Sequence, residues 1–101
     1  MPGENRAQNN RRVEWALPAL QSYQGTLQRI AEQDELTVAL FEQRVMRALI
    51  VLASQPDLGT PGTRAGTRSF AVPKTGHTLE YRVQGDILRV TRWYRQRRKR
   101  P

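Results

Sequence analysis

The chain contains no cysteine, which excludes disulfide bonds and thiolate metal sites. It also contains no apolar run that approaches the roughly 20 residues of a membrane-spanning helix. Its first ten residues, MPGENRAQNN, are polar and lack the apolar segment that a secretory signal needs. We therefore expect a cytoplasmic protein that does not associate with membranes.

Motifs for cofactors and metals are missing as well. The sequence has no glycine-rich phosphate loop, no spacing of metal ligands and no nucleophile triad, so we expect neither a cofactor nor a bound metal. The only histidine, His77, lies close to a turn and is expected to be solvated. A chain of 101 residues is enough for one small domain, whose modest core would gain from a partner that covers part of its surface.

Positive charge is in excess, and it gathers at one end of the chain. The formal net charge is +8. Residues 1–86 carry ten basic and nine acidic side chains, whereas residues 87–101 carry seven basic side chains and no acidic one. Such a block attracts nucleic acid, acidic protein surfaces or anionic lipid, and the charge alone does not select among them.

The chain begins with two segments of different character. Residues 1–10 are polar and are expected to be disordered. Residues 11–17 alternate, with Val13, Trp15 and Leu17 on one face and mainly polar side chains on the other. This alternation predicts a strand with one buried face.

Two helices are expected after this strand. Apolar residues recur at steps of three and four, which predicts a helix over about 18–33. Asp34 is a good N-cap for a second helix, which runs to about Ser54 and ends before Gln55-Pro56. Because the joint between the helices is short, they should form an antiparallel hairpin.

The second half of the chain has the periodicity of strands. Residues 56–67 contain two prolines and three glycines, which predicts a loop with no core element. Alternating segments follow at 68–72, 77–83 and about 87–93. A tight turn at 84–86 should join the last two strands as a hairpin.

This order predicts an α+β fold, β-α-α-β-β-β, with a helical hairpin packed on one face of a four-stranded, mostly antiparallel sheet. The domain would span residues 11–94, followed by a basic tail at 95–101. In the last strand, Leu88 and Val90 should point inward, while Arg89, Thr91, Trp93 and Arg95 should lie on the opposite, open face. By the same alternation the open face would collect Glu14, Ser69, Ala71, Thr78, Glu80, Arg82, Arg89 and Arg95.

Four short pieces of sequence stand in a distinctive order: VEWALPAL at 13–20, LASQPDLGTPG at 52–62, GTRSFAV at 66–72 and YRVQGD at 81–86. Together with Arg92 and Arg98, they resemble the RelE/ParE toxins of bacterial toxin–antitoxin pairs, over residues 11–98. ParE-type members usually carry one arginine late in the last strand and another just beyond it.

The resemblance implies one of two activities. RelE-like members cut mRNA on the ribosome, whereas ParE-like members lack the cutting residues and poison DNA gyrase. Cleavage of RNA without a metal needs a base, an acid and a cation for the phosphate. RelE-like toxins place two lysines on the second strand and an arginine on the third, and the matching positions here hold Ser69, Ala71 and Thr78. None of these three can do that work.

The resemblance therefore implies a ParE-like toxin of a type II module, which inhibits DNA gyrase by binding and arrests growth. It also implies neutralisation by a cognate antitoxin, in a hetero-oligomer that can bind operator DNA through the antitoxin. The expected target-binding residues are Arg89, Arg92, Trp93, Tyr94, Arg95, Arg97 and Arg98. The apolar excess on the helices suits an amphipathic antitoxin segment, with Leu27, Ile30, Phe41, Val45 and Ile50 as expected contacts.

Three other interpretations stay open. The first is a ribosome-dependent mRNA endonuclease of RelE type, with an unusual catalytic site of Glu80, Arg82, Arg89 and Tyr94. The second is a degenerate toxin that only sequesters antitoxin or helps it to bind DNA. The third is structural: the basic end is a solvated tail, and the charges of the open face are ordinary cross-strand pairs.

Overall fold

The structure is a computed structural model of the 101-residue chain, and it describes residues 11–96. Its elements are β1 (Arg12–Trp15), α2 (Leu17–Gln33), α3 (Glu35–Ser54), η1 (Pro56–Leu58), β2 (Thr60–Pro61), β3 (Arg68–Val72), β4 (His77–Gln84) and β5 (Ile87–Arg95). The expected disorder of residues 1–10 falls outside the described residues, as does the basic tail beyond residue 96.

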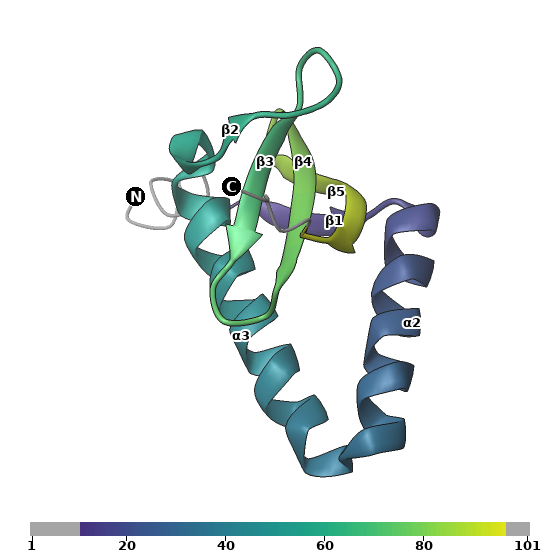
Figure 1. Ribbon diagram of the computed structural model, residues 1–101. Helices are drawn as coiled ribbons and strands as arrows, with labels where there is room; N and C mark the ends of the chain where they lie inside the picture. The colour runs from purple at the N-terminus through teal and green to yellow at the C-terminus, as the bar shows by residue number, and fades with distance from the viewer. Residues whose placement is uncertain (1–10, 97–101) are drawn as a thin grey trace, which may run out of the picture.

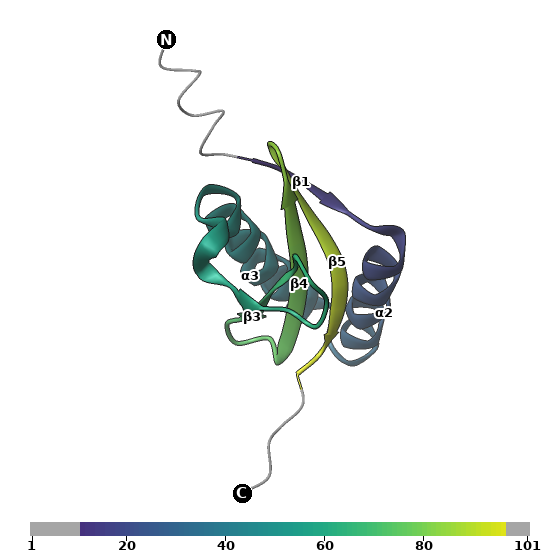
Figure 2. The same cartoon turned by 90° about the horizontal axis from the view of Figure 1, so that it is seen from above.

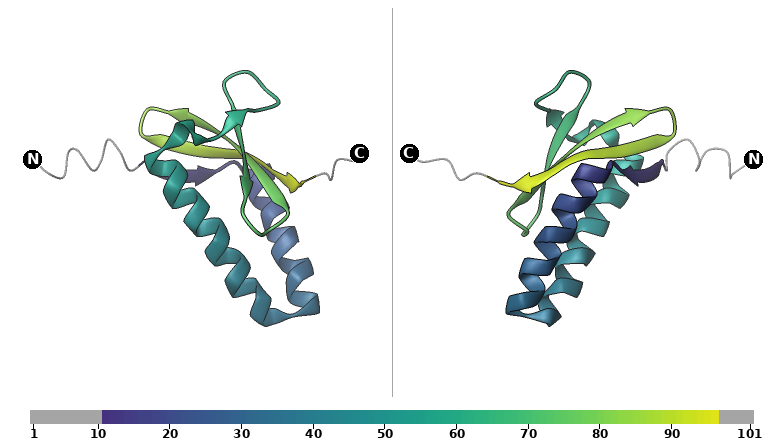
Figure 3. Two further views of the ribbon diagram at one scale, coloured as in Figure 1. Left: turned by 60° about the vertical axis from the view of Figure 1, so that its left-hand side comes forward. Right: turned by 90° about the vertical axis from the view of Figure 1, so that its right-hand side faces the viewer.

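The strands form one sheet in the order β1-β5-β4-β3-β2. β1 pairs with β5 in parallel, and the other neighbours are antiparallel. Figure 3 shows both helices on one side of this sheet, so the predicted α+β fold with a helical hairpin on one face is confirmed. The strand count differs from the prediction, because β2 pairs with the start of β3 inside a segment that we expected to be only loop. Pro61 lacks a backbone N–H and is tolerated there because β2 is the outermost strand.

The helical hairpin begins and turns where the sequence predicts. Pro18 lies in the first turn of α2, where its missing N–H costs no helical hydrogen bond. Asp34 caps α3, because its carboxylate accepts the backbone N–H of Leu36 at 3.0 Å and the hydroxyl of Thr37 at 2.8 Å. The two helices diverge from this joint toward the sheet (Figure 1), and α2 lies beside β5 while α3 lies on the other side of β4 (Figure 2). Among residues 11–96, no helix is both long and apolar enough to cross a membrane.

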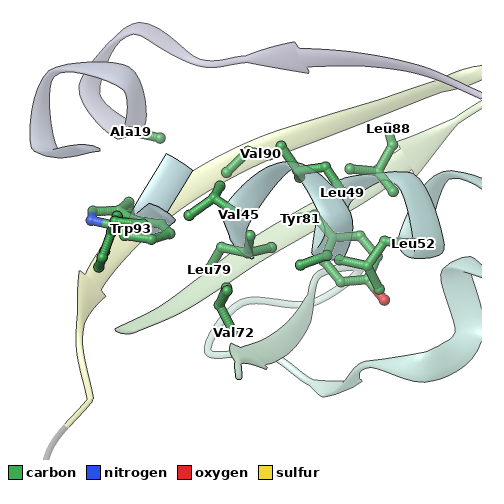
Figure 4. Close-up of a cluster of buried hydrophobic side chains, with 12 residues drawn as sticks. Ala19, Val45, Leu49, Leu52, Val72, Leu79, Tyr81, Leu88, Val90 and Trp93 are labelled. Carbon is green, nitrogen blue, oxygen red and sulfur yellow. The ribbon is translucent and has the colours of Figure 1, made fainter. Parts of the chain in front are cut away.

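The hydrophobic core lies between this hairpin and the helix-facing side of the sheet. The buried cluster combines one residue of α2 with α3 and the three longest strands: Ala19, Phe41, Val45, Ala48, Leu49, Leu52, Val72, Leu79, Tyr81, Leu88, Val90 and Trp93. Figure 4 shows Trp93 at one end of the cluster and Leu52 and Leu88 at the other. Leu88 and Val90 of β5 are therefore buried, as the sequence predicts.

An irregularity in the β4–β5 ladder changes which side chains of β5 face the core. Glu80 is opposite Arg92 and Tyr81 is opposite Val90, so Thr91 is an extra residue on β5. Such a bulge inverts the alternation after it. Trp93 therefore points into the core and is only 4% exposed. The expectation that Trp93 lies on the open face is wrong, because simple alternation takes no account of the bulge. The same expectation is wrong for Arg95, which is opposite His77 in the ladder and so leaves β5 on the same side as Trp93.

Candidate functional site at the end of β5

A buried carboxylate lies on the sheet face away from the helices. Glu80, in the middle of β4, is only 1% exposed. One of its oxygens, Oε1, accepts the Thr63 hydroxyl at 3.0 Å, and the other, Oε2, accepts the Tyr94 hydroxyl at 3.3 Å. Nη1 of Arg92 is 3.5 Å from Oε2. We call Thr63, Glu80, Arg92 and Tyr94 the Glu80 cluster. A buried carboxylate is stable only with such partners, since burial without them is costly.

The loop between β2 and β3 makes this burial possible. Figure 3 shows that the loop extends over the sheet on the side away from the helices. The backbone N–H of Gly62 donates to the carbonyl of Thr67 at 2.9 Å, and the Thr67 hydroxyl donates to the carbonyl of Arg64 at 2.7 Å. Gly62 packs so closely on Thr67 that an added Cβ would collide with the Thr67 hydroxyl. This tight turn carries Thr63 to the carboxylate of Glu80.

The base of the same loop is fastened to the core by Tyr81. Its hydroxyl accepts the backbone N–H of Gly59 at 3.0 Å and donates to the carbonyl of Pro56. Burial raises the pKa of the Tyr81 phenol above its usual value, so this hydroxyl keeps its proton, and can donate, to a more alkaline pH than an exposed tyrosine does. β4 thus holds the loop at two points, through Tyr81 on the core side and Glu80 on the open side.

Arg92 is the ordered cation of the Glu80 cluster. Its Nη1 donates to the Thr63 hydroxyl at 3.2 Å, and its guanidinium carbon lies 4.6 Å from the centre of the Tyr94 ring. The side chain remains nearly half exposed. One end of the guanidinium is held, because it stacks on the Tyr94 ring and pairs with the buried carboxylate of Glu80. Its other N–H groups stay on the solvent side.

The four residues of the alternative catalytic site do not all lie in contact with one another. Glu80 and Tyr94 are in contact, as that interpretation requires. Arg89 instead pairs with Glu14 at 3.1 Å across β1 and β5. Arg82 lies opposite Arg89 in the ladder, and its buried Nε has no hydrogen-bond partner among residues 11–96. The set Glu80, Arg82, Arg89 and Tyr94 therefore does not form one site.

The expected target-binding residues are also divided. Arg92, Tyr94 and Arg95 reach the surface at the end of β5. Trp93 does not, because its indole N–H donates to the Thr26 hydroxyl at 3.0 Å inside the fold. Arg97 and Arg98 lie outside the described residues. Arg92 pairs with Glu80 in a contact that sequence reasoning missed, since only the bulge places the two side by side.

His77 is packed rather than solvated. Its ring stacks on Trp93, with 5.0 Å between ring centres and an angle of 8° between the planes, and meets Phe41 edge-on at 5.8 Å. Its Nδ1 is 3.0 Å from the carbonyl oxygen of Thr75. His77 was expected in solvent because it borders a turn. Instead it faces the core side at the start of β4 and supports the buried indole.

The expected antitoxin contacts are partly core residues. Phe41 and Val45 are 6% and 1% exposed, because they form the inner face of α3, and so they offer no free surface. Leu27 and Ile30 are partly buried against the same core. Ile50 is 62% exposed and is the one member of the set that is freely accessible.

Two grooves flank α3. The larger, of about 430 Å³, lies between α3 and β3, with Leu40, Val51 and Phe70 as its main apolar residues. It is also lined by three cations, Arg44, Arg47 and Lys74. The second groove, of about 320 Å³, lies on the other side of α3 and is lined by Arg11, Val13, Trp15, Met46, Leu49, Ile50 and Ala53. Within the described part of the chain, no acidic side chain lines either groove.

Three positions on the open face bear on the RNA-cleavage interpretation. Ser69 and Ala71 of β3 lie opposite Glu80 and Thr78 of β4, so the predicted positions are neighbours in space as well. No basic side chain stands at Ser69, Ala71 or Thr78. Across residues 11–96 there is also no group of three or more histidine, aspartate or glutamate side chains that could hold a metal ion.

The fold is shared with a known toxin–antitoxin structure. A chain of the solved structure "Chromosomal ParDE TA system from P. aeruginosa" is similar to this protein with a TM-score of 0.76 and 14% sequence identity, over 88% of this chain and 99% of that one. The fold is ParE-like. The resemblance to RelE/ParE proteins read from the sequence is therefore confirmed in the fold. No protein-family model matches the sequence, and no curated protein sequence does.

Proposed function

We propose that this protein is the toxin of a type II toxin–antitoxin module and that it inhibits DNA gyrase in the cytoplasm, so that growth stops. The observation that carries the proposal is the ParE-like fold combined with an open face that lacks the RNA-cutting residues at Ser69, Ala71 and Thr78. Such a toxin would act by binding its target rather than by catalysis. Its contacts would lie at the end of β5, with Arg92, Tyr94 and Arg95, and continue through Arg97 and Arg98. Arg89, paired with Glu14, would contribute at the margin.

The larger groove beside α3 is the proposed antitoxin site. Its apolar residues Leu40, Val51 and Phe70 suit the apolar side of an amphipathic segment. The groove is also lined by Arg44, Arg47 and Lys74, which suit acidic side chains on the same segment. The expected occupant is therefore an acidic amphipathic segment of the antitoxin. The outer edge of β3 adds a second feature, because β2 pairs only with Arg68 and Ser69. Within residues 11–96, the outer edge of β3 from Phe70 to Val72 has no strand partner, so an antitoxin strand could be added there.

Gyrase assays test the target. The full chain is added to purified gyrase, ATP and relaxed plasmid, and both supercoiling and protein-linked DNA breaks are scored. At a stoichiometric amount of toxin, we expect supercoiling to stop and protein-linked DNA breaks to accumulate. The double variant Arg92→Gln/Arg95→Gln should need at least ten times more protein for the same inhibition. The matched double variant Arg44→Gln/Arg47→Gln removes the same charge from the other face and should inhibit normally. Supercoiling that continues unchanged at a large excess of toxin rejects gyrase as the target.

The second candidate is a RelE-like, ribosome-dependent mRNA endonuclease, favoured by the contact between Glu80 and Tyr94. Its weakness is access, because Glu80 is buried and both of its oxygens are engaged. A translating extract supplies the ribosome and mRNA that this activity needs. If the wild-type chain cuts mRNA there and Glu80→Gln abolishes cutting while the fold is kept, the endonuclease replaces the gyrase inhibitor. Intact mRNA with both proteins supports the first proposal.

A further inference from the structure

The end of β5 separates two hollows that share Tyr94 and Arg95. The first, of about 360 Å³, is lined by Thr63, Arg92, Tyr94 and Arg95. The second, of about 350 Å³, lies between α2 and β5, and Arg29 and Arg95 are the arginines that line it. Among residues 11–96, no aspartate or glutamate lines either hollow. We call Arg29, Arg92 and Arg95 the cationic ridge.

The fold fixes the Arg92 side chain and the backbone of the strand end that carries Arg95. Arg92 is held by Glu80, Thr63 and the Tyr94 ring. The end of β5 is fixed by the backbone N–H of Gln96, which donates to the carbonyl of Gly76 at 2.8 Å. Cations whose positions are set before binding lose less conformational entropy on meeting a ligand than free side chains do.

Anion binding needs free N–H groups, and the ridge has them. In the contacts among residues 11–96, only Nη1 of Arg92 is engaged by the Glu80 cluster, which leaves its remaining donors for a ligand. Arg95 has no ion pair within the same residues. Both guanidinium groups can therefore form bidentate contacts with an oxyanion, the geometry in which arginine binds phosphate most strongly.

From this arrangement we infer that the cationic ridge is a binding site for the phosphodiester backbone of nucleic acid, and that the protein binds nucleic acid directly, with or without gyrase. The ridge by itself fits an acidic protein surface less well, so the proposed contact with gyrase would need further residues beside it. Protein interfaces depend on exposed aromatic or aliphatic anchors, and here Trp93 and Thr26 lie below the surface while Arg92 covers one face of Tyr94.

Direct binding of the full chain provides the test. Fluorescence anisotropy is measured with a labelled 20-base-pair DNA duplex and with a single-stranded RNA of the same length, at several salt concentrations. We expect Arg92→Gln/Arg95→Gln to weaken binding at least tenfold and to reduce the salt slope by about 2, because each lost phosphate contact removes roughly 0.9 from it. Comparable affinity for DNA and RNA would show that the site recognises the phosphodiester backbone that both share. A tenfold preference for one probe would identify that nucleic acid as the ligand.

The control is Arg44→Gln/Arg47→Gln, which has the same net charge but leaves the ridge intact. It should bind within about twofold of wild type. Equal losses in the two double variants would mean that binding follows net charge alone, and the inference would fail. It would also fail if Arg92→Gln/Arg95→Gln bound normally, or if poly-glutamate bound as tightly as the duplex with the same dependence on Arg92 and Arg95. Circular dichroism and thermal unfolding verify that each variant is folded.

Discussion

The indole N–H of Trp93 donates to the hydroxyl of Thr26 at 3.0 Å and so joins the end of β5 to the middle of α2. Both residues are buried. Tyr23 meets the indole edge-on at 4.9 Å, and His77 stacks on it at 5.0 Å. The strand end that presents Arg92 and Arg95 is thus anchored by a polar contact inside an aromatic cluster.

Replacing Thr26 with valine keeps the shape and removes this acceptor. The buried N–H of Trp93 would lose its partner, so we expect unfolding free energy to fall by about 1–3 kcal/mol. Urea titration followed by Trp fluorescence measures the change. Thr26→Ser, which keeps the hydroxyl, should lose clearly less. A valine variant as stable as the wild type would contradict the role of this hydrogen bond, because valine keeps the methyl group and loses only the hydroxyl.

The pair Glu80–Arg92 should be energetically coupled. Glu80→Gln removes a buried charge from three partners, and we expect it to cost about 1–3 kcal/mol. In a double-mutant cycle with Arg92→Gln, the coupling should be on the order of 1 kcal/mol or more. The pair Glu14–Arg89 on the same face is more exposed and serves as the control. Its coupling should lie at about 0.2–1 kcal/mol, and a larger value there than for Glu80–Arg92 would contradict the assigned role of burial.

Gly59 lies where no side chain fits. A Cβ at this position would be 2.6 Å from the Tyr81 hydroxyl and 2.9 Å from the carbonyl oxygen of Ser69. We expect Gly59→Ala to lower stability by about 1–3 kcal/mol, because Tyr81 must shift. Gly25→Ala is the matched control in α2, where the nearest atom is 3.8 Å away, and it should raise stability by about 0.5–1 kcal/mol. A neutral Gly59→Ala in thermal unfolding would refute the close contact.

Tyr23 makes stability depend on alkaline pH. Burial, and then the nearby charge of Glu42, raise the pKa of Tyr23 from 10.0 to about 12. Below pH 10 the phenol is protonated in the folded and unfolded chains, and this contribution to stability is complete. Between pH 10 and about 12 the unfolded chain releases the proton first, so stability falls. Urea midpoints measured from pH 9 to 12 should drop less steeply in Tyr23→Phe, with a residual slope from Tyr81; parallel curves would contradict a buried Tyr23.

The proposed antitoxin groove predicts a charge effect. Arg47 is exposed on α3 and lines the groove, so Arg47→Glu should weaken binding of the antitoxin encoded beside this chain at least tenfold. Isothermal titration with that antitoxin gives the affinity. Arg29→Glu, an exposed helical arginine of α2 outside the groove, makes the same charge change and should bind normally. The groove is the wrong site if both variants bind like wild type.

Sequence periodicity was sufficient for most of the fold. The helix spacing, the Asp34 cap and the alternation of β4 correspond to local rules that hold wherever the segment packs. β2 escaped this reasoning because two residues carry no periodic signal, and Pro61 argues against a strand. Phe41 and Val45 were misassigned to a free surface because the apolar stripe of α3 is broad, and only the sheet decides which part of it is covered.

The site required the tertiary structure. Sequence alone determined the basic end, the absence of cysteine, the identity of the residues at 69, 71 and 78, and the ParE-like order of elements. Each of these depends only on which residues are present and how they are spaced. The extra residue Thr91 decided that Arg92 meets Glu80 and that Trp93 is buried. The loop between β2 and β3, which carries Thr63, decided that Glu80 is covered. A bulge and a long-range contact are set by packing between distant segments, and no local pattern encodes them.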